Sequence, residues 1–360
     1  MPRCKVYLSD EGFGHIVRQR AVLEELRRVL PDLHVTVQTE AQAAAASRFI
    51  SGARLIKKYN NITWDKQPNG SPDLLKIKER FVNYLHTSSA FIADDLQAFD
   101  YDFVISDFVY EAFESAARSG IPSFGVAHFT WDWFFSKLYP PAVHSDVIGH
   151  FMHMASKATR LYFPPFTPEE ILHHYRDKAL EVPLILRSGI QHKTSHGESK
   201  FKVLMMDSGA GVIGESIQKA LKAVAPLDDF LFFASEKFAT GQANLRTLPA
   251  NDLMVDYVAD MDLVIGRAGF NTISECVGLR TPMLLIGEAM NPEMNENILM
   301  LKKQNLGSFI SMPTFERDLD VYLPAFLKHE YKHIKHTMDK HEIATTGAEM
   351  IVHDMLNYLP

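Results

Sequence analysis

Short apolar runs rich in strand-forming residues alternate with longer amphipathic stretches along the chain. In the first half, the runs occupy residues 5–9 (KVYLS), 34–39 (HVTVQT), 103–107 (FVISD) and 122–127 (PSFGVA). Between the first two runs, residues 16–30 place apolar side chains at helical spacing. Strands that alternate with helices predict a parallel sheet covered by helices on both faces.

The same pattern restarts in the second half of the chain. Residues 162–168 (YFPPFTP) predict a break in regular structure, and residues 190–200 (IQHKTSHGESK) have the polar, aperiodic composition of an interdomain linker. Further strands are predicted at 201–207, 230–234, 263–266 and 282–286. Helices are predicted to end near residue 224 and to occupy about 272–279, 294–305 and, as one or two helices, 335–359.

The length of 360 residues is about twice that of a usual domain, which favours two domains. We expect a Rossmann-like N-terminal domain over residues 1–190 and a second domain over 191–340. Residues 341–360 are expected to form a C-terminal helix that packs back on the N-terminal domain. With 46% hydrophobic and 22% charged residues, the composition excludes a disordered or collagen-like chain.

Charge and cysteine content argue against nucleic-acid binding and against an exported protein. The formal net charge of -7 provides no global basic field, so we expect no nucleic-acid partner. Two cysteines, Cys4 and Cys276, fit a reducing compartment. The N-terminus lacks the apolar stretch of a signal peptide, and no apolar window reaches the roughly 20 residues of a spanning helix. We therefore expect a cytoplasmic protein.

A glycine-rich loop follows the first predicted strand of the second half. Its Gly209, Gly211 and Gly214 match G-x-G-x-x-G between a strand and a helix, where backbone amides attract phosphate. Glu236 closes the next predicted strand, as a dinucleotide fingerprint requires for a ribose. The pattern is compatible with a nicotinamide cofactor, with another phosphate ligand, or with a tight turn.

Residues 266–282 (GRAGFNTISECVGLRTP) form a second turn between a strand and a helix. One interpretation is a capping box, in which Thr272 caps the helix and Glu275 reaches back to the amide of the cap. That interpretation leaves Arg267 and Gly269 unexplained.

This block resembles the donor-binding domain of GT-B fold glycosyltransferases, in particular the MurG-like enzymes and their relatives in families 1 and 28. In those proteins a segment (S/G)-R-x-G-x-x-T-x-x-E precedes a Leu-Gly-x-Pro run, a strand, and a loop that ends in an Asn on a helix. Here the corresponding residues, in the same order over about thirty positions, are Arg267, Gly269, Thr272, Glu275, 277–282 and Asn297.

The resemblance implies an α/β chain of the GT-B fold, with two Rossmann-like parallel-sheet domains that face each other across a cleft. It implies that Glu275 accepts hydrogen bonds from both ribose hydroxyls of a nucleotide sugar. It implies that Gly269 and Thr272 lie beside the diphosphate, where the helix N-terminus supplies positive potential. The residues implied to face the phosphates from the glycine loop are Ser208, Gly209, Ala210 and Gly211.

The sequence departs from the family pattern at the residues that contact the donor sugar. Glu293 matches the position that contacts the hydroxyls of the donor sugar, four residues before Asn297. The family's second polar residue at this place is Met294 here, so the second sugar contact lacks a polar side chain. A solvated helix start is the alternative interpretation of residues 292–295.

The first half resembles the family less closely. Its loop from Gly12 to His15 is similar to the Gly-x-Gly-His loop that follows the first strand in the family, with Gly14 on the donor side. The resemblance implies that His15 is the general base for the acceptor hydroxyl, that Asp107 orients it, and that Arg187 neutralises the leaving diphosphate. A packing role is the alternative for each of these three side chains.

Other groups of polar residues carry no metal prediction. The two Asp-x-Asp triplets, at 100–102 and 260–262, precede strands and would lie at the edge of a parallel sheet that does not bind ligands. The histidine pairs lack the companion carboxylates and spacing of a zinc site. We therefore expect no metal ion and no cofactor besides the nucleotide sugar.

The aromatic stretch 128–141 (HFTWDWFFSKLYPP) has two interpretations. Its Trp131, Trp133, Phe134 and Phe135 pack in the core, or they stack on a greasy acceptor or attach the domain edge to a membrane.

The expected function is transfer of a sugar from a nucleoside diphosphate donor, with UDP favoured, to an acceptor hydroxyl. We expect inversion at the anomeric carbon and no requirement for metal. The acceptor is unknown, with a lipid-linked compound or a glycan as candidates and peripheral membrane contact open. The alternatives are a nucleotide-sugar hydrolase or 2-epimerase, an NAD-dependent oxidoreductase built on Gly209, and a non-catalytic sugar-nucleotide sensor.

Overall fold

The chain divides into two compact units. The computed structural model describes residues 1–10, 14–58, 65, 67, 73–97, 99–187, 190, 200–207, 213–249, 254–288 and 290–359. Unit 1 comprises Met1–Arg187 and Thr345–Pro360, and unit 2 comprises Ser188–Ala344. Residues 345–360 at the C-terminus therefore belong to the same unit as the N-terminal half of the chain.

Unit 1 contains a seven-stranded sheet in the order β3-β2-β1-β4-β5-β6-β7, and all of its paired strands are parallel. Its strands are short and mostly buried on both faces, which is why they are near-continuous apolar runs in the sequence. The bounds are β1 Arg3–Tyr7, β2 His34–Gln38, β3 Arg54–Ile56, β4 Phe103–Ser106, β5 Ser123–Val126, β6 Arg160–Phe163 and β7 Ala179–Glu181.

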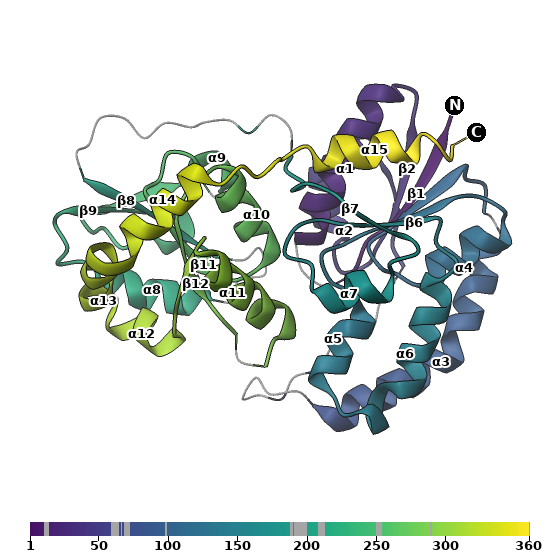
Figure 1. Ribbon diagram of the computed structural model, residues 1–360, viewed down its shortest axis with the longest axis horizontal. Coiled ribbons are helices and arrows are strands. Elements are labelled where there is room, and N and C mark those ends of the chain that lie inside the picture. The colour runs from purple at the N-terminus through teal and green to yellow at the C-terminus, as the bar shows by residue number, and fades with distance from the viewer. Residues whose placement is uncertain are drawn as a thin grey trace. The chain divides into compact units, whose positions relative to one another are not determined.

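Helices cover both faces of this sheet (Figure 1). The last helix of the chain, α15, lies against α1, the first, and Ile351 and Met355 join Val22 and Leu26 of α1 in one buried cluster. The helices of unit 1 are α1 Gly14–Val29, α2 Ala43–Phe49, α3 Leu74–Leu96, α4 Glu111–Arg118, α5 Trp131–Leu138, α6 Pro141–Ala155, α7 Glu169–His174 and α15 Gly347–Met355.

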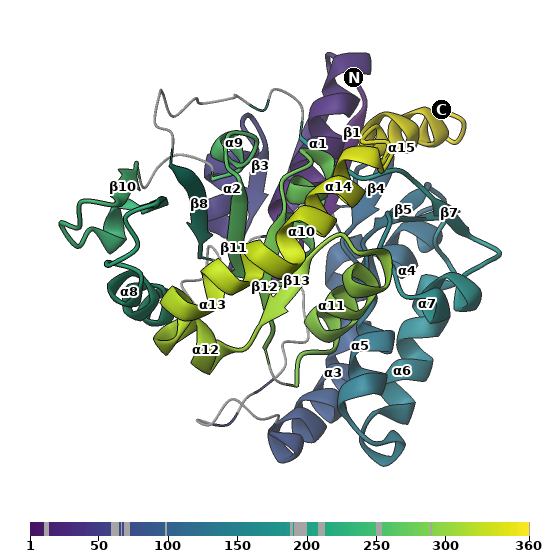
Figure 2. The same cartoon turned by 60° about the vertical axis from the view of Figure 1, so that its left-hand side comes forward.

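Unit 2 repeats the architecture with a six-stranded parallel sheet in the order β10-β9-β8-β11-β12-β13. Figure 2 shows the helices that cover this sheet. The strands are β8 Phe201–Met206, β9 Phe230–Ser235, β10 Leu245–Leu248, β11 Leu263–Arg267, β12 Met283–Ile286 and β13 Ser308–Ile310. The helical elements are α8 Gly214–Ala223, η1 Glu236–Phe238, α9 Val255–Val258, α10 Phe270–Gly278, α11 Pro292–Gln304, α12 Met312–Arg317, α13 Leu319–Phe326, η2 Leu327–Tyr331 and α14 Lys332–Lys340.

The strand order reverses at the same point in both sheets. In unit 1 the switch lies between β1 and β4, and in unit 2 between β8 and β11. Open α/β sheets bind ligands beyond the carboxyl ends of their strands at this switch. The topology therefore directs attention to the loops that follow β1 and β4 and to those that follow β8 and β11.

The predicted strands with long apolar runs are confirmed, and the predicted break at residues 162–168 is wrong at its start. Tyr162 and Phe163 are the buried end of β6, and the strand stops before Pro164, which has no amide to continue the ladder. The sequence gives no clear signal for the three-residue strands β3, β7 and β13, because three residues are too few to show a period.

The aromatic stretch packs in the core of unit 1. Trp131, Trp133, Phe134 and Phe135 are all buried in one cluster with residues of α3 and α6. Ring centroids of Trp131 and Phe135 lie 5.6 Å apart in a stacked arrangement. The packing interpretation is confirmed, and the interpretation that these rings stack on an acceptor or attach to a membrane is wrong.

The two Asp-x-Asp triplets lie at the amino edges of the sheets. Asp102 accepts a 2.6 Å hydrogen bond from the amide of Arg3 and donates its own amide to the carbonyl of Arg3 at 2.8 Å. Asp262 makes the same pair of bonds with Lys202, at 2.8 and 3.0 Å. In each unit this aspartate therefore joins the start of the first strand to the start of its neighbour, at the edge opposite the carboxyl ends.

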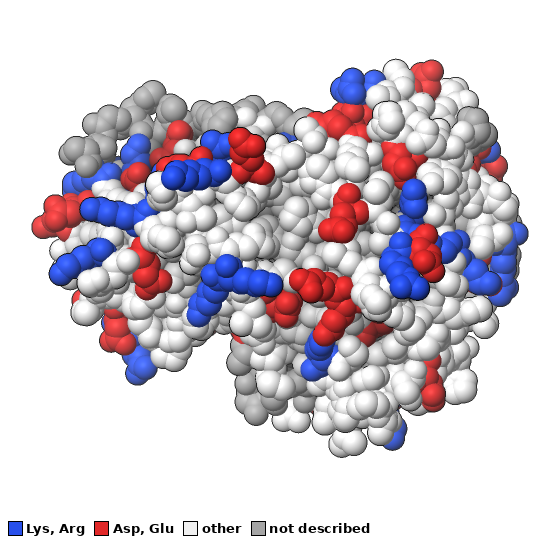
Figure 3. Space-filling model, in the orientation of Figure 1, with Lys and Arg blue, Asp and Glu red and all other residues white. Residues whose placement is uncertain are grey.

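Three further observations concern membrane spans, metal sites and surface charge. None of the helices in the described residues is long and apolar enough to cross a bilayer. Within the described ranges, no three His, Cys, Asp or Glu side chains gather closely enough to hold a metal ion. On the face that Figure 3 shows, Lys and Arg side chains are interspersed with Asp and Glu, so this face presents no broad basic surface.

The chain returns to unit 1 through a tight contact at Gly347, the first residue of α15. A Cβ built on Gly347 would lie 2.2 Å from the carbonyl oxygen of Pro183 and 2.9 Å from that of Leu184. The amide of Gly347 donates to that Leu184 carbonyl at 3.1 Å, and Thr346 forms a bridge with Ile185. The absence of a side chain allows α15 to approach the segment that ends unit 1.

We predict that Gly347→Ala lowers the free energy of unfolding of unit 1 by about 2 kcal/mol, because the added Cβ has to displace backbone. Gly149→Ala is the matched control, since Gly149 is exposed inside α6 with no heavy atom within 4 Å of a built Cβ. That change should raise the same free energy by roughly 0.5–1 kcal/mol. All three tryptophans precede residue 188, so urea unfolding followed by tryptophan fluorescence reports on unit 1. Equal midpoints for the two variants would contradict the argument.

Candidate active site

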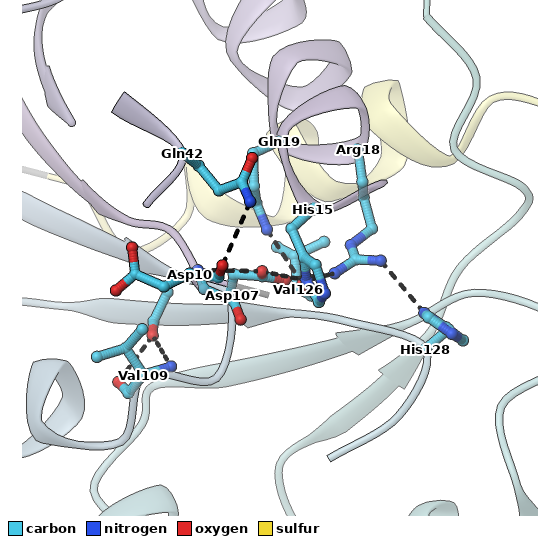
Figure 4. Close-up of polar contacts among 11 residues, drawn as sticks. Asp10, His15, Arg18, Gln19, Gln42, Asp107, Val109, Val126 and His128 are labelled. Carbon is cyan, nitrogen blue, oxygen red and sulfur yellow. Dashed lines mark hydrogen bonds and ion pairs between the residues drawn. The ribbon is translucent and has the colours of Figure 1, made fainter. Parts of the chain in front are cut away.

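Three polar side chains converge at the switch point of unit 1. His15 is the second residue of α1, which follows β1, Asp107 directly follows β4, and His128 lies two residues beyond the end of β5. β1 pairs with β4 and β4 with β5, so the carboxyl ends of these strands are neighbours. Figure 4 shows the resulting group of side chains.

The carboxylate of Asp107 lies at the centre of this group. His15 Nδ1 forms an ion pair with Asp107 Oδ2, and Arg18 Nη2 forms another with Oδ1. The amide of Ser9, at the end of the β1 segment, adds a 3.4 Å hydrogen bond to Oδ2. Both oxygens of one buried carboxylate are therefore occupied by donors from the β1–α1 segment.

Burial and charge together set the state of Asp107. Its side chain is 0% exposed, whereas that of His15 is 14% exposed. Burial by itself raises the pKa of Asp107. The positive charges and hydrogen bonds of His15 and Arg18 lower it by more, so the net pKa lies well below its usual range. Asp107 is thus ionised at neutral pH and accepts the Nδ1 proton of His15, which leaves Nε2 of the partly exposed ring to accept a proton.

The turn after β4 fixes the position of the Asp107 carboxylate. Phe108 has a φ of 53°, in the left-handed region that a bulky residue rarely adopts. Ser106 fixes the turn, because its hydroxyl donates to the Val109 carbonyl and accepts from the Val109 amide, each at 2.9 Å. Phe108 itself is buried among aromatic side chains. Backbone strain at this position is consistent with a functional constraint on Asp107.

Three members of the group were not assigned roles in the sequence analysis. Arg18 Nη1 lies 3.2 Å from His128 Nδ1, and Asp10 accepts hydrogen bonds from the Thr39 hydroxyl and from the amides of Glu40 and Ala41 at 2.7–2.9 Å. Two signals were available in the sequence. Arg18 lies in the first turn of the helix predicted over residues 16–30, three residues after His15, and His128 directly follows a predicted strand.

In unit 2, the glycine loop lies mostly outside the described residues. Ser208, Gly209, Ala210 and Gly211 belong to that part, whereas Gly214 begins α8. Asp207 precedes the loop, and its carboxylate accepts from Lys237 at 2.9 Å and from the amide of Ile213 at 3.3 Å. Glu236 directly follows β9, as predicted from the sequence.

The β11–α10 turn corrects the capping-box interpretation. α10 begins at Phe270 with Gly269 at its N-cap, so Thr272 is the third helical residue and Glu275 lies in the second turn. Glycine has no side chain to satisfy the first amides of the helix, and a Cβ built on Gly269 would meet no heavy atom within 4 Å. Thr272 and Glu275, three residues apart and both half-buried, lie on one helix face next to this N-terminus.

The loop after β12 contributes a second set of contacts to the same turn. Arg267 ends β11 and donates to Glu288 Oε2 at 2.6 Å, while Asn297 of α11 donates to the carbonyl of Ala268 at 3.0 Å. Asn291 caps α11 by accepting from the amide of Met294 at 3.2 Å. The turn that carries Gly269 is thus held in place by side chains from two neighbouring segments.

The departure from the family pattern at the donor sugar has a structural counterpart. Met294 is buried, and its Sδ lies 3.8 Å from Arg267 Nη2. Glu293 is half-buried in the first turn of α11. Arg187 is buried at the end of unit 1, and its role at the diphosphate stays a prediction.

Comparisons with known proteins agree with this architecture. A model of the family described as glycosyl transferase family 1 matches residues 6–327. The chain is 25% identical over 296 residues to an L-arabinokinase of Arabidopsis thaliana, covering 78% of this chain and 28% of that protein. It is also 25% identical over 180 residues to a UDP-N-acetylglucosamine--N-acetylmuramyl-(pentapeptide) pyrophosphoryl-undecaprenol N-acetylglucosamine transferase of Geobacillus thermodenitrificans, covering 46% of this chain and 51% of that enzyme.

The chain thus spans about a quarter and about half of the lengths of these two relatives. Among solved structures, the calicheamicin glycosyltransferase is similar with a TM-score of 0.68 and 12% identity, over 99% of this chain and 98% of that one. Family match and topology lead to the same assignment: the chain belongs to glycosyl transferase family 1 and has the GT-B fold, built from two Rossmann-like units with parallel sheets.

Proposed function

We propose that this protein transfers a glycosyl group from a nucleoside diphosphate sugar to an acceptor hydroxyl, with His15 as the general base. The observation that carries the proposal is the ion pair of His15 with the fully buried, ionised Asp107. A carboxylate that holds the Nδ1 proton stabilises the imidazolium that forms when Nε2 takes up a proton.

The reaction is a single displacement. The acceptor O–H bond breaks as His15 Nε2 takes the proton, and the acceptor oxygen forms a bond to the anomeric carbon. The bond from that carbon to the diphosphate breaks, and its electron pair leaves with the nucleoside diphosphate. Because the incoming and leaving oxygens lie on opposite faces of the carbon, the product has the inverted configuration.

The β11–α10 turn supports the donor half of the proposal. The N-terminus of α10 carries positive potential, which suits a diphosphate, and Thr272 adds a hydroxyl near this end of the helix. Glu275, three residues further along α10, is a carboxylate that can accept hydrogen bonds from both hydroxyls of a ribose. This electrostatic stabilisation of the leaving group involves no metal ion.

For the donor we propose UDP as the nucleotide, and for the acceptor we propose only two chemical classes. A relative that matches 46% of this chain is named for a UDP-N-acetylglucosamine donor, which favours UDP here. The same name contains a lipid-linked acceptor, so a lipid-linked compound and a glycan are the two acceptor classes to test. We propose a cytoplasmic location on the basis of cysteine content alone.

We predict that UDP stabilises the wild type by several degrees in a thermal-shift assay and that Glu275→Gln weakens this binding. The amide loses one of two acceptor oxygens, which corresponds to about 2 kcal/mol, or roughly thirtyfold in Kd. A panel of UDP, dTDP, GDP and NAD on the wild type, Glu275→Gln and Glu236→Gln separates the proposals. Stabilisation by NAD alone, dependent on Glu236 and independent of Glu275, would indicate an oxidoreductase instead.

We predict that His15→Ala lowers kcat by between about a hundredfold and ten-thousandfold without loss of UDP binding. The control is His34→Ala, because His34 is exposed at the amino end of β2. UDP release from UDP-sugars is measured with and without a panel of hydroxyl acceptors. Release at the full rate without any acceptor would make the protein a hydrolase, and full activity of His15→Ala would remove His15 as the base.

A further inference from the structure

One carboxylate, Asp107, is shared between two cationic side chains of the same helix. Arg18 lies one helical turn after His15 on α1, and the two contact different oxygens of Asp107. The guanidinium of Arg18 is almost fully buried, with 3% of its side chain exposed. Asp107, which would stabilise a protonated His15, is thus already paired with the permanent positive charge of Arg18.

The geometry places this charge directly beside the imidazole ring. Arg18 Nη2 lies 3.3 Å from His15 Nδ1, and Figure 4 shows Arg18 extended between this group and His128. A guanidinium only donates hydrogen bonds, so a hydrogen bond between Arg18 Nη1 and His128 Nδ1, which lie 3.2 Å apart, requires the His128 proton to be on Nε2. His128 therefore contacts the guanidinium at Nη1, whereas Asp107 contacts it at Nη2.

The other groups of the described part of unit 1 that bear on the charge at His15 are the ring of Phe129, the carboxylate of Asp10 and the N-terminus of α1. The ring of Phe129, which follows β5, lies edge-on with centroids 6.4 Å apart and carries no charge. Asp10, which follows β1, is a second buried carboxylate, and three donors of the segment after β2 contact its Oδ1. The N-terminus of α1 adds partial positive charge next to His15, in the same direction as Arg18.

We propose that Arg18 is a positioning residue that lowers the basicity of His15 by sharing Asp107 and by standing beside the imidazolium that forms during catalysis. This inference rests on the proposed role of His15 as the base. Its consequence is that His15 stays unprotonated, and so ready to accept a proton, at a lower pH than a histidine with an undivided aspartate. The protein should keep its activity further into the acidic range than a His–Asp pair alone allows.

The test compares the pH dependence of kcat/KM in the wild type, Arg18→Met and Arg18→Lys. Methionine keeps length and removes the charge, so we expect the acid limb of the profile to move to higher pH by about one unit. Lysine keeps the charge, so its acid limb should stay close to that of the wild type. Arg20→Met is the control on the same helix, because Arg20 pairs with Glu24 at 2.6 Å and should leave the profile unchanged.

A second measurement does not depend on turnover. The His15 ring signal, assigned by its absence in His15→Gln, is titrated by NMR in the wild type and in Arg18→Met, and we expect the same upward shift of about one unit. A folded Arg18→Met protein with the wild-type titration and the wild-type acid limb would overturn the inference. Full activity of His15→Gln would refute the proposed base and leave the NMR comparison valid.

The wild type alone provides a further test in case Arg18→Met does not fold. Multiple-bond ¹H–¹⁵N correlation spectra report which ring nitrogen of each histidine carries the proton. We expect His15 to carry it on Nδ1, toward Asp107, and His128 to carry it on Nε2. A proton on Nδ1 of His128 would be incompatible with a hydrogen bond from Arg18 and would overturn the inference.

Discussion

The parallel pairing of β1 with β4 is the constraint on which the active-site group of unit 1 depends. Neighbouring parallel strands end at the same edge, so the segments that follow Tyr7 and Ser106 have to lie side by side. One of these segments leads into α1 with its histidine, and the other presents the aspartate. Residues about ninety positions apart in the sequence therefore meet without any long loop between them.

The burial of Asp107 explains why its neighbours are arranged as they are. A carboxylate removed from water is unfavourable by several kcal/mol unless charged partners and hydrogen bonds compensate. Here the compensation comes from His15, Arg18 and the amide of Ser9, all on the β1–α1 segment. The strained turn at Phe108 adds a steric constraint, because Phe108 is fixed in the core and Ser106 closes the turn from both sides.

Unit 2 has the same topology, and its proposed donor site is of a different kind. In the described residues, its switch point presents the start of α10 and the polar residues Thr272 and Glu275. The contacts around the β11–α10 turn are made by Arg267, Asn297 and their partners, and these hold the turn and leave Thr272 and Glu275 on one face of the helix. Under the proposed function, a turn held in this way suits the diphosphate, whose charge grows as the bond to the sugar breaks.

The sequence by itself determined the strand–helix rhythm, the restart of that rhythm in the second half, and the family motif at Arg267 to Asn297. These features depend on local periodicity and on residue order, both of which can be read directly from the amino-acid sequence. It also indicated His15 and Asp107 separately, through a resemblance. It did not indicate the role of Arg18 or His128, because their helix-face and strand-end positions are local signals that do not show whether the side chain meets a buried partner from a distant segment.

Only the tertiary structure decided those roles, and it also decided between interpretations that the sequence left open. The aromatic stretch proved to be core because α3 and α6, distant in the chain, cover it. Thr272 proved not to be a cap because α10 begins two residues earlier than its apolar pattern suggests. In each case the deciding quantity is burial or a contact between distant segments, which depends on how the elements pack and not on the residues next to it in the chain.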